Sequence, residues 1–149
     1  MSNVKPIPEG YHSVTPYLIV DKAAQVMEFL QRTFGAQVLM KMDNPDGSIG
    51  HSELRVGDSV IMLAGARGEW KAMPTMTHVY VEDADAVYGK ALEAGATAVS
   101  AMQDQFYGDR SGGVKDVSGN LWWIATHKED LSMEELKRRH EAVRGAHSG

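Results

Sequence analysis

The sequence predicts an α+β protein in which two βαβββ modules form one curved, closed sheet with helices outside, plus a C-terminal helix. Two observations predict this fold. A strand-to-helix pattern occurs twice, at an offset of about 60 residues. Three strand-like runs separated by turn residues follow each copy. With 149 residues the chain is predicted to be a single domain, 1–149, with modules at 11–64 and 75–127 and a last helix at 131–144.

The first module begins with the β-branched run Tyr17-Leu-Ile-Val. Apolar residues then recur at intervals of three or four up to Phe34, which predicts a helix with one buried face. Gly35 follows at the position where glycine often closes a helix. The next strands are expected at 37–42, 51–56 and 59–64, since turn residues separate these runs.

The second module repeats this order, starting at Val79-Tyr-Val-Glu-Asp and closing its helix at Ala94-Gly95-Ala96. Its strands are expected at 97–101, in a less regular stretch at 107–115, and at 121–126. The linker 65–74 between the modules is rich in glycine and polar residues. Ser132-Met-Glu-Glu135 has a capping-box pattern and predicts the last helix, which would pack on the domain or on a partner subunit.

Composition narrows the classes of function. Apolar residues make up 43% and charged residues 23%, as in ordinary globular proteins. The net charge is −5 without a basic stripe, so no nucleic-acid partner is expected. No apolar run approaches the roughly 20 residues of a membrane span, so no membrane association is expected. The absence of cysteine excludes thiol chemistry and suits a reducing compartment, so we predict a cytoplasmic location.

Strand alternation predicts which side chains face the concave side of the sheet. If Leu54 faces the helices, the three polar residues His51, Glu53 and Arg55 face the cavity. Such a row is either a satisfied polar network or a ligand-binding surface, because polar groups are costly to bury unpaired. We favour ligand contact for His51 and Glu53.

The second module contributes further candidates by the same alternation. The side chains expected to face inward are His78 and Tyr80, joined by Tyr107 and Asp109 if the irregular strand keeps its register. Trp122 and Trp123 are adjacent, so one must face the core and the other the cavity. Core packing is predicted for Trp122 and cavity lining for Trp123.

Four segments resemble the vicinal oxygen chelate superfamily of glyoxalases, bleomycin-resistance proteins and dioxygenases, in particular its PhnB-like branch. They are Thr15-Pro-Tyr-Leu-Ile-Val, His51-Ser-Glu-Leu-Arg-Val-Gly-Asp-Ser-Val-Ile-Met-Leu, Tyr107-Gly-Asp-Arg-Ser-Gly-Gly-Val-Lys-Asp and Gly119-Asn-Leu-Trp-Trp-Ile-Ala-Thr-His127. The resemblance covers 11–130. The last turn departs mildly from that branch, with Asp116-Val-Ser-Gly119 where Asp-Pro-Phe-Gly is usual.

The resemblance implies four metal-ligand positions, one on the first and one on the last strand of each module. By alignment they fall on Thr15, Met62, Met76 and Trp123. Tryptophan has no lone pair to donate, methionine suits soft ions, and threonine alone binds weakly. No metal and no other cofactor is therefore predicted at these positions. A displaced metal site formed by His51, Glu53 and His78 is the alternative.

The leading hypothesis is a metal-free protein that binds a small, planar or aromatic molecule. Its predicted ligand-binding residues are Thr15, Tyr17, Arg55, Met62, Met76, His78, Tyr80, Tyr107, Asp109 and Trp123, beside His51 and Glu53. The alternative is a lyase or isomerase with Glu53 or His51 as the catalytic general base, with or without a displaced divalent metal. An accessory subunit is a third hypothesis. The resemblance also implies a homodimer, in which the modules pair either within one chain or by exchange between two chains.

Overall fold

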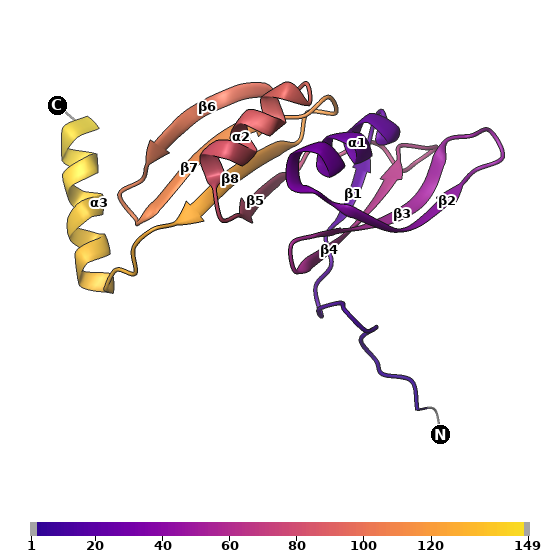
Figure 1. Ribbon diagram of the computed structural model, residues 1–149, viewed down its shortest axis with the longest axis horizontal. Coiled ribbons are helices and arrows are strands. Elements are labelled where there is room, and N and C mark those ends of the chain that lie inside the picture. The colour runs from indigo at the N-terminus through magenta and orange to yellow at the C-terminus, as the bar shows by residue number, and fades with distance from the viewer. Residues whose placement is uncertain (1–2, 148–149) are drawn as a thin grey trace.

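Two consecutive βαβββ modules and a C-terminal helix make up the computed structural model, which describes residues 3–147 (Figure 1). Residues 1–2 and 148–149 of the predicted single domain lie outside the described residues. The first module contains β1 (Tyr17–Val20), α1 (Ala23–Phe34), β2 (Gln37–Asp43), β3 (Ile49–Val56) and β4 (Ser59–Gly65). The second contains β5 (Met76–Tyr80), α2 (Ala84–Glu93), β6 (Thr97–Asp104), β7 (Asp109–Lys115) and β8 (Leu121–His127), and α3 (Met133–His147) follows it.

Each module forms its own mixed four-stranded sheet. The strand orders are β1-β4-β3-β2 and β5-β8-β7-β6, with the first strand of each module parallel to the last and the other pairs antiparallel. The prediction of one closed sheet is therefore wrong for this chain. β1 and β5 bond to a neighbouring strand on one side only, and the linker covers part of the free edge of β1, where Met73 N donates to Ile19 O at 3.1 Å.

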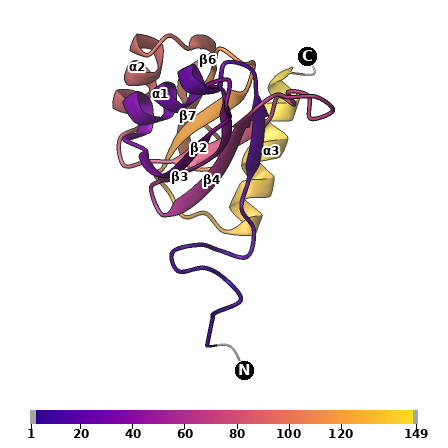
Figure 2. The ribbon, with the colours of Figure 1, turned by 90° about the vertical axis from the view of Figure 1, so that its right-hand side faces the viewer.

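The hydrophobic core lies between the sheets and the two helices. Figure 2 shows α1 and α2 together on one side of the strands. The rings of Phe29 and Phe34 on α1 lie 6.0 and 5.9 Å from that of Trp122 on β8, so an aromatic contact joins the two modules. Trp122 is fully buried, which confirms its predicted core position. Leu54 is also buried beneath the helices, so β3 has the predicted facing.

The final hairpin fixes the alternation of the two tryptophans. The buried carboxylate of Asp116 accepts hydrogen bonds from Asn120 N, Ser118 N and Trp122 Nε1, the last at 2.8 Å. Because the indole of Trp122 is held on the core side, the next residue, Trp123, faces the other side of the sheet. The turn that the sequence predicts at 116–120 thus orients a candidate site residue.

Two segments extend from the body of the molecule, the N-terminal arm and α3 (Figure 1). The described residues of α3 include none that is buried. Arg139 pairs with Glu129 at 2.9 Å and donates to Phe106 O at 3.2 Å, and the ring of His140 lies 5.5 Å from that of Phe106. None of the helices within residues 3–147 is both long and apolar enough to cross a membrane.

Candidate functional site

A chain of polar side chains lies on the face of the first sheet that the helices leave uncovered. His51 and Glu53 are two residues apart on β3 and therefore share this face. Glu53 Oε2 lies 2.7 Å from His51 Nε2, and His51 Nδ1 lies 2.9 Å from the hydroxyl of Tyr17 on β1. Tyr11, just before β1, donates its hydroxyl to the other oxygen of Glu53. The sequence predicts three of these four residues and misses Tyr11.

Glu53 is 6% exposed, yet its hydrogen bonds keep it ionised. The hydrogen bond from Tyr11 and then that from His51 hold the pKa of Glu53 below its ordinary value. The same bond to the Glu53 carboxylate raises the pKa of Tyr11. The carboxylate is thus a satisfied anion at neutral pH and a weakened general base.

A hollow of about 530 Å³ lies beside this polar chain on the same face. Its lining is mainly apolar and aromatic, with Tyr17, Ile19, Ala64, Met73 and Trp70, together with Asn44, Arg67 and two glycines. The linker 65–74 forms one wall, because Arg67 and Trp70 exchange backbone hydrogen bonds of 2.9 Å in a tight hairpin. The sequence signal for this wall is Trp70, a large aromatic residue in a linker rich in glycine and polar residues.

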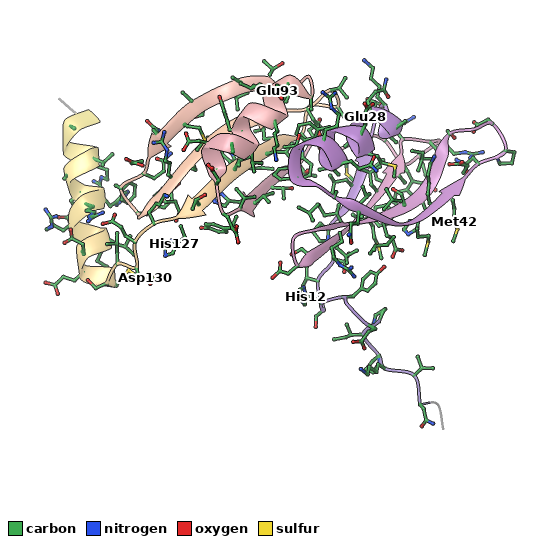
Figure 3. All side chains as sticks on the ribbon, viewed as in Figure 1. His12, Glu28, Met42, Glu93, His127 and Asp130 are labelled. Carbon is green, nitrogen blue, oxygen red and sulfur yellow. The ribbon has the colours of Figure 1, made fainter. Side chains whose placement is uncertain are left out.

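Several predicted residues of the first sheet border this hollow or the polar chain. Met62 pairs with both Tyr17 and Glu53 across the sheet. Arg55 continues the β3 row beyond Glu53 and reaches toward the backbone of Gly10. Figure 3 shows Met42 projecting from β2 away from the helices, whereas Glu28 lies on the helix side. The uncovered face therefore combines methionines with the polar row.

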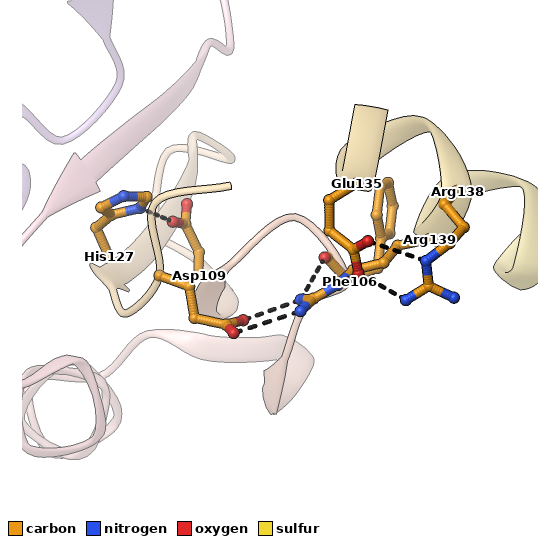
Figure 4. Close-up of polar contacts among 7 residues, drawn as sticks. Phe106, Asp109, His127, Glu135, Arg138 and Arg139 are labelled. Atoms are coloured by element: carbon orange, nitrogen blue, oxygen red, sulfur yellow. Dashed lines mark hydrogen bonds and ion pairs between the residues drawn. The ribbon is translucent and has the colours of Figure 1, made fainter. Parts of the chain in front are cut away.

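The second module carries a similar cluster around Asp109, which is 3% exposed. The Asp109 carboxylate accepts a hydrogen bond from the hydroxyl of Tyr80 at 2.8 Å. It also lies 2.8 Å from His127 Nδ1 (Figure 4). His78 Nε2 is 3.9 Å from the same carboxylate. His127 Nε2 bonds to Asp130 at 2.8 Å, which closes the cluster at the start of the segment leading to α3. His127 and Asp130 belong to no predicted site.

The charges in this cluster shift two pKa values. Hydrogen bonding to Asp109, and secondarily to Asp130, raises the pKa of His127. Hydrogen bonding to Asp109 also raises the pKa of Tyr80, so this phenol remains protonated as a donor. Each module therefore carries a buried carboxylate bonded to a tyrosine and a histidine.

The indole of Trp123 lies next to Gly113 of the neighbouring strand β7. Trp123 pairs with His78 on one side and with Gly113 on the other. A Cβ at Gly113 would be 3.2 Å from Cδ2 and Cε3 of the indole, so the glycine leaves room for this ring. Met76 lies two pairs before His78 along β5, opposite Leu121. Tyr107 lies in the turn before β7 and packs edge-on against Phe106.

A wider groove of about 1260 Å³ separates the two modules. Its lining includes all of β5 except Met76, as well as Thr15, His127 and the turn between β3 and β4. Thr33 also borders the groove; it is 2% exposed, and its hydroxyl has no hydrogen-bond partner among the described residues. His78 and Tyr80 thus face this groove, whereas Tyr17 lines the smaller hollow.

The side chains at the expected ligand positions do not fit a divalent metal ion. Thr15, Met62, Met76 and Trp123 supply one hydroxyl, two thioethers and an indole that has no lone pair to donate, which is a poor ligand set for such an ion. Within residues 3–147, no group of three His, Asp, Glu or Cys side chains is arranged to hold a metal. The displaced site at His51, Glu53 and His78 is therefore not formed within one chain, since His78 lies in the other module beside Asp109.

Comparison with known proteins gives the family. The model of the Glyoxalase/Bleomycin resistance protein/Dioxygenase superfamily matches residues 10–124. An uncharacterized protein of Mycobacterium bovis, Mb0911c, is 33% identical over 136 residues, which cover 84% of this chain and 90% of that protein.

Solved structures share the fold at lower sequence identity. TioX from Micromonospora sp. ML1 has a TM-score of 0.64 at 23% identity, covering 81% of this chain and 100% of that one. The PhnB protein of Bacillus cereus has a TM-score of 0.62 at 16% identity, covering 77% of this chain and 99% of that one. With a family model that spans most of the two modules, the chain belongs to the Glyoxalase/Bleomycin resistance protein/Dioxygenase superfamily.

Proposed function

We propose that this protein binds a small aromatic molecule, without a metal ion, on the uncovered face of its first module. The observation that carries the proposal is the hollow of about 530 Å³ between Tyr17 and Trp70. Apolar and aromatic walls with a few polar groups are typical of small-molecule sites. The polar chain from Tyr17 through His51 to Glu53 lies at its border and supplies groups that can orient a ligand.

Binding fits this site better than proton transfer does. A general base works best when its pKa lies near the working pH. Hydrogen bonds from Tyr11 and His51 instead lower the pKa of Glu53, and both nitrogens of His51 already have partners. We therefore assign His51 and Glu53 to the positioning of Tyr17 and of the ligand. A lyase or isomerase with one of them as general base remains the second candidate, supported by the closeness of the two side chains.

Binding is tested with naphthalene-sized aromatic probes, by calorimetry on the native protein. Tyr17→Ala is expected to weaken binding by about tenfold or more, because an aromatic contact contributes about 1–3 kcal/mol. His140→Gln on α3 is the control and should bind like the native protein. Binding that is unchanged in Tyr17→Ala would place the ligand elsewhere. Product formation that is lost in Glu53→Gln while binding persists would favour the lyase or isomerase.

We also propose that a second copy of the chain completes the assembly. β5 is an edge strand along the groove between the modules, and its residues Met76 and Tyr80 are 63% and 60% exposed. Unpaired strand edges are templates for pairing with another strand. The buried hydroxyl of Thr33 beside the groove has no hydrogen-bond partner among the described residues, and a second copy would offer one. A homodimer would thereby bring the predicted residues of the second module close to a ligand.

Light scattering after size-exclusion chromatography tests the homodimer. The native protein is expected to elute as a dimer, and Met76→Lys as a monomer, because a charge on an edge strand opposes pairing. Met133→Lys is the matched control, since Met133 is also exposed but lies on α3. A native protein that stays monomeric as its concentration rises would contradict the proposal, as would dissociation by the control substitution alone.

Two finer assignments complete the proposal. We place the chain in the PhnB-like branch, supported by the segment Tyr107-Gly-Asp-Arg and the final Trp-Trp hairpin. We propose that the protein acts in the cytoplasm, because the absence of cysteine among its 149 residues suits a reducing compartment. Cell fractionation tests the location, and recovery outside the cytoplasmic fraction would overturn it.

A further inference from the structure

We infer that the ligand of the first module is an aromatic anion, and that the linker hairpin recognises it, with Trp70 contacting the ring and Arg67 the negative charge. This inference rests on the proposed binding function and names the chemical class of the ligand. Both residues lie in the linker between β4 and β5, outside the two sheets that contain most of the predicted site residues. Both line the hollow of about 530 Å³ beside Tyr17.

The hairpin is fixed to the sheet at both ends, so its side chains have defined positions. Ala66 N donates to Val20 O at 2.9 Å on one side, and Met73 N donates to Ile19 O at 3.1 Å on the other. Between these anchors, Arg67 and Trp70 are joined by two backbone hydrogen bonds. The hairpin therefore holds an indole and a guanidinium over the same hollow, where a ligand can contact both.

Trp70 is suited to contact a ring because its indole is uncovered. It is 65% exposed, although it belongs to a wall of the hollow, and Tyr17 in the same lining is 46% exposed. An aromatic ring in this hollow would cover both side chains. Gly50 keeps space at the lining, since a Cβ there would lie 2.6 Å from Oδ1 of Asn44.

The charges of the hollow favour an anion. Arg67 is the charged residue of the lining, and no carboxylate of the described chain lines the hollow. Hydrogen bonds from the amide and the hydroxyl of Ser48 are the main cause of the lowered pKa of Asp46. The positive charge of Arg67 contributes less to this lowering. The Arg67 side chain makes no hydrogen bond or ion pair within the described part of the chain. Its guanidinium is thus available for a carboxylate or a similar anion, which it can bind through two parallel hydrogen bonds.

Matched pairs of acid and alcohol test the inference. The probes are 2-naphthoate with 2-naphthalenemethanol and benzoate with benzyl alcohol, titrated by calorimetry into the native protein, Arg67→Gln, Lys71→Gln and Trp70→Ala. Lys71→Gln removes the same charge from the same linker but lies outside the hollow's lining. Arg67 is exposed, so its replacement is not expected to unfold the protein.

The native protein is expected to bind each acid about tenfold or more tightly than its alcohol. Arg67→Gln should remove this preference and leave alcohol binding within about twofold, while Lys71→Gln keeps it. Trp70→Ala should weaken both members of a pair. Equal binding of acid and alcohol by the native protein, or an acid preference that survives Arg67→Gln, would overturn the inference but leave aromatic binding standing. Failure of all four probes to bind the native protein would overturn both.

Discussion

The hydroxyl of Tyr11 donates a hydrogen bond to the buried carboxylate of Glu53, a residue 42 positions later in the chain. This contact ties the N-terminal arm to the centre of the first sheet. It also continues the polar chain through His51 to Tyr17 at the hollow. The arm thereby affects the charge of a candidate site residue.

Tyr11→Phe tests this connection through acid stability. The lowered pKa of Glu53 contributes stability that is present above the unfolded-state pKa and is lost as the pH falls through the folded-state pKa. Removing the largest cause should raise the pKa of Glu53 and shift acid unfolding to higher pH. We expect a loss of about 1–3 kcal/mol at neutral pH. Carbon NMR titration of the carboxylate measures the pKa; an unchanged value would show that Tyr11 does not act on Glu53.

Asp116→Ala tests the final hairpin. The substitution leaves Trp122 Nε1 and the amides of Ser118 and Asn120 without their acceptor in a buried position. We expect the free energy of unfolding, measured in denaturant, to fall by about 2–4 kcal/mol. Val117→Ala in the same turn is the control, because Val117 is 49% exposed, and should change it by less than about 0.5 kcal/mol. Equal effects of the two substitutions would contradict this role.

The sequence predicted local features better than distant contacts. Alternation along one strand correctly separated Trp122 from Trp123, because side chains on a strand alternate whatever the partners are. The contact of Tyr11 with Glu53 could not be predicted, since it joins a segment without periodicity to a strand far along the chain. The prediction of one closed sheet was wrong for a similar reason: local pattern predicts the strands β1 and β5 but not which strands lie beside them.

In the candidate site, too, local pattern predicts some residues, whereas distant contacts determine others. The row His51, Glu53 and Arg55 followed from alternation, and the structure bonds the first two to each other. Local pattern does not indicate Trp70 and Arg67, because the linker is fixed to β1 by tertiary hydrogen bonds that no periodicity predicts. A large aromatic residue among glycines and charges is unusual for a connection, and this is the signal that could have identified the wall of the hollow.

Two glycine substitutions should have opposite effects on stability. Gly113→Ala places a Cβ about 3.1 Å from Val99 and 3.2 Å from the ring of Trp123, so the ring must move. We expect a loss of about 1–3 kcal/mol. Gly89→Ala in α2 meets open space and should stabilise the protein by about 0.5–1 kcal/mol. Thermal unfolding of both variants gives the comparison; a neutral Gly113→Ala would show that Trp123 is not held against this strand.

Asp130→Asn tests the histidine that lies between two carboxylates. Asp109 is the main cause of the raised pKa of His127 and Asp130 the second, so the variant should lower this pKa without restoring its ordinary value. A raised histidine pKa contributes stability below the unfolded-state pKa, which is lost as the pH rises through the folded-state pKa. The native protein should therefore be stabilised relative to Asp130→Asn in weak acid, with the difference disappearing toward alkaline pH.

Proton NMR of the imidazole, followed across pH, measures the change in Asp130→Asn directly. Glu141→Gln removes the same charge from the exposed side of α3 and should leave the pKa of His127 in place. If both substitutions lower it equally, the cause is the general negative charge of the C-terminal segment and not the 2.8 Å contact with Asp130. If only Asp130→Asn lowers it, the contact connects the buried Asp109 cluster to the segment that leads into α3, and protonation of His127 strengthens that connection.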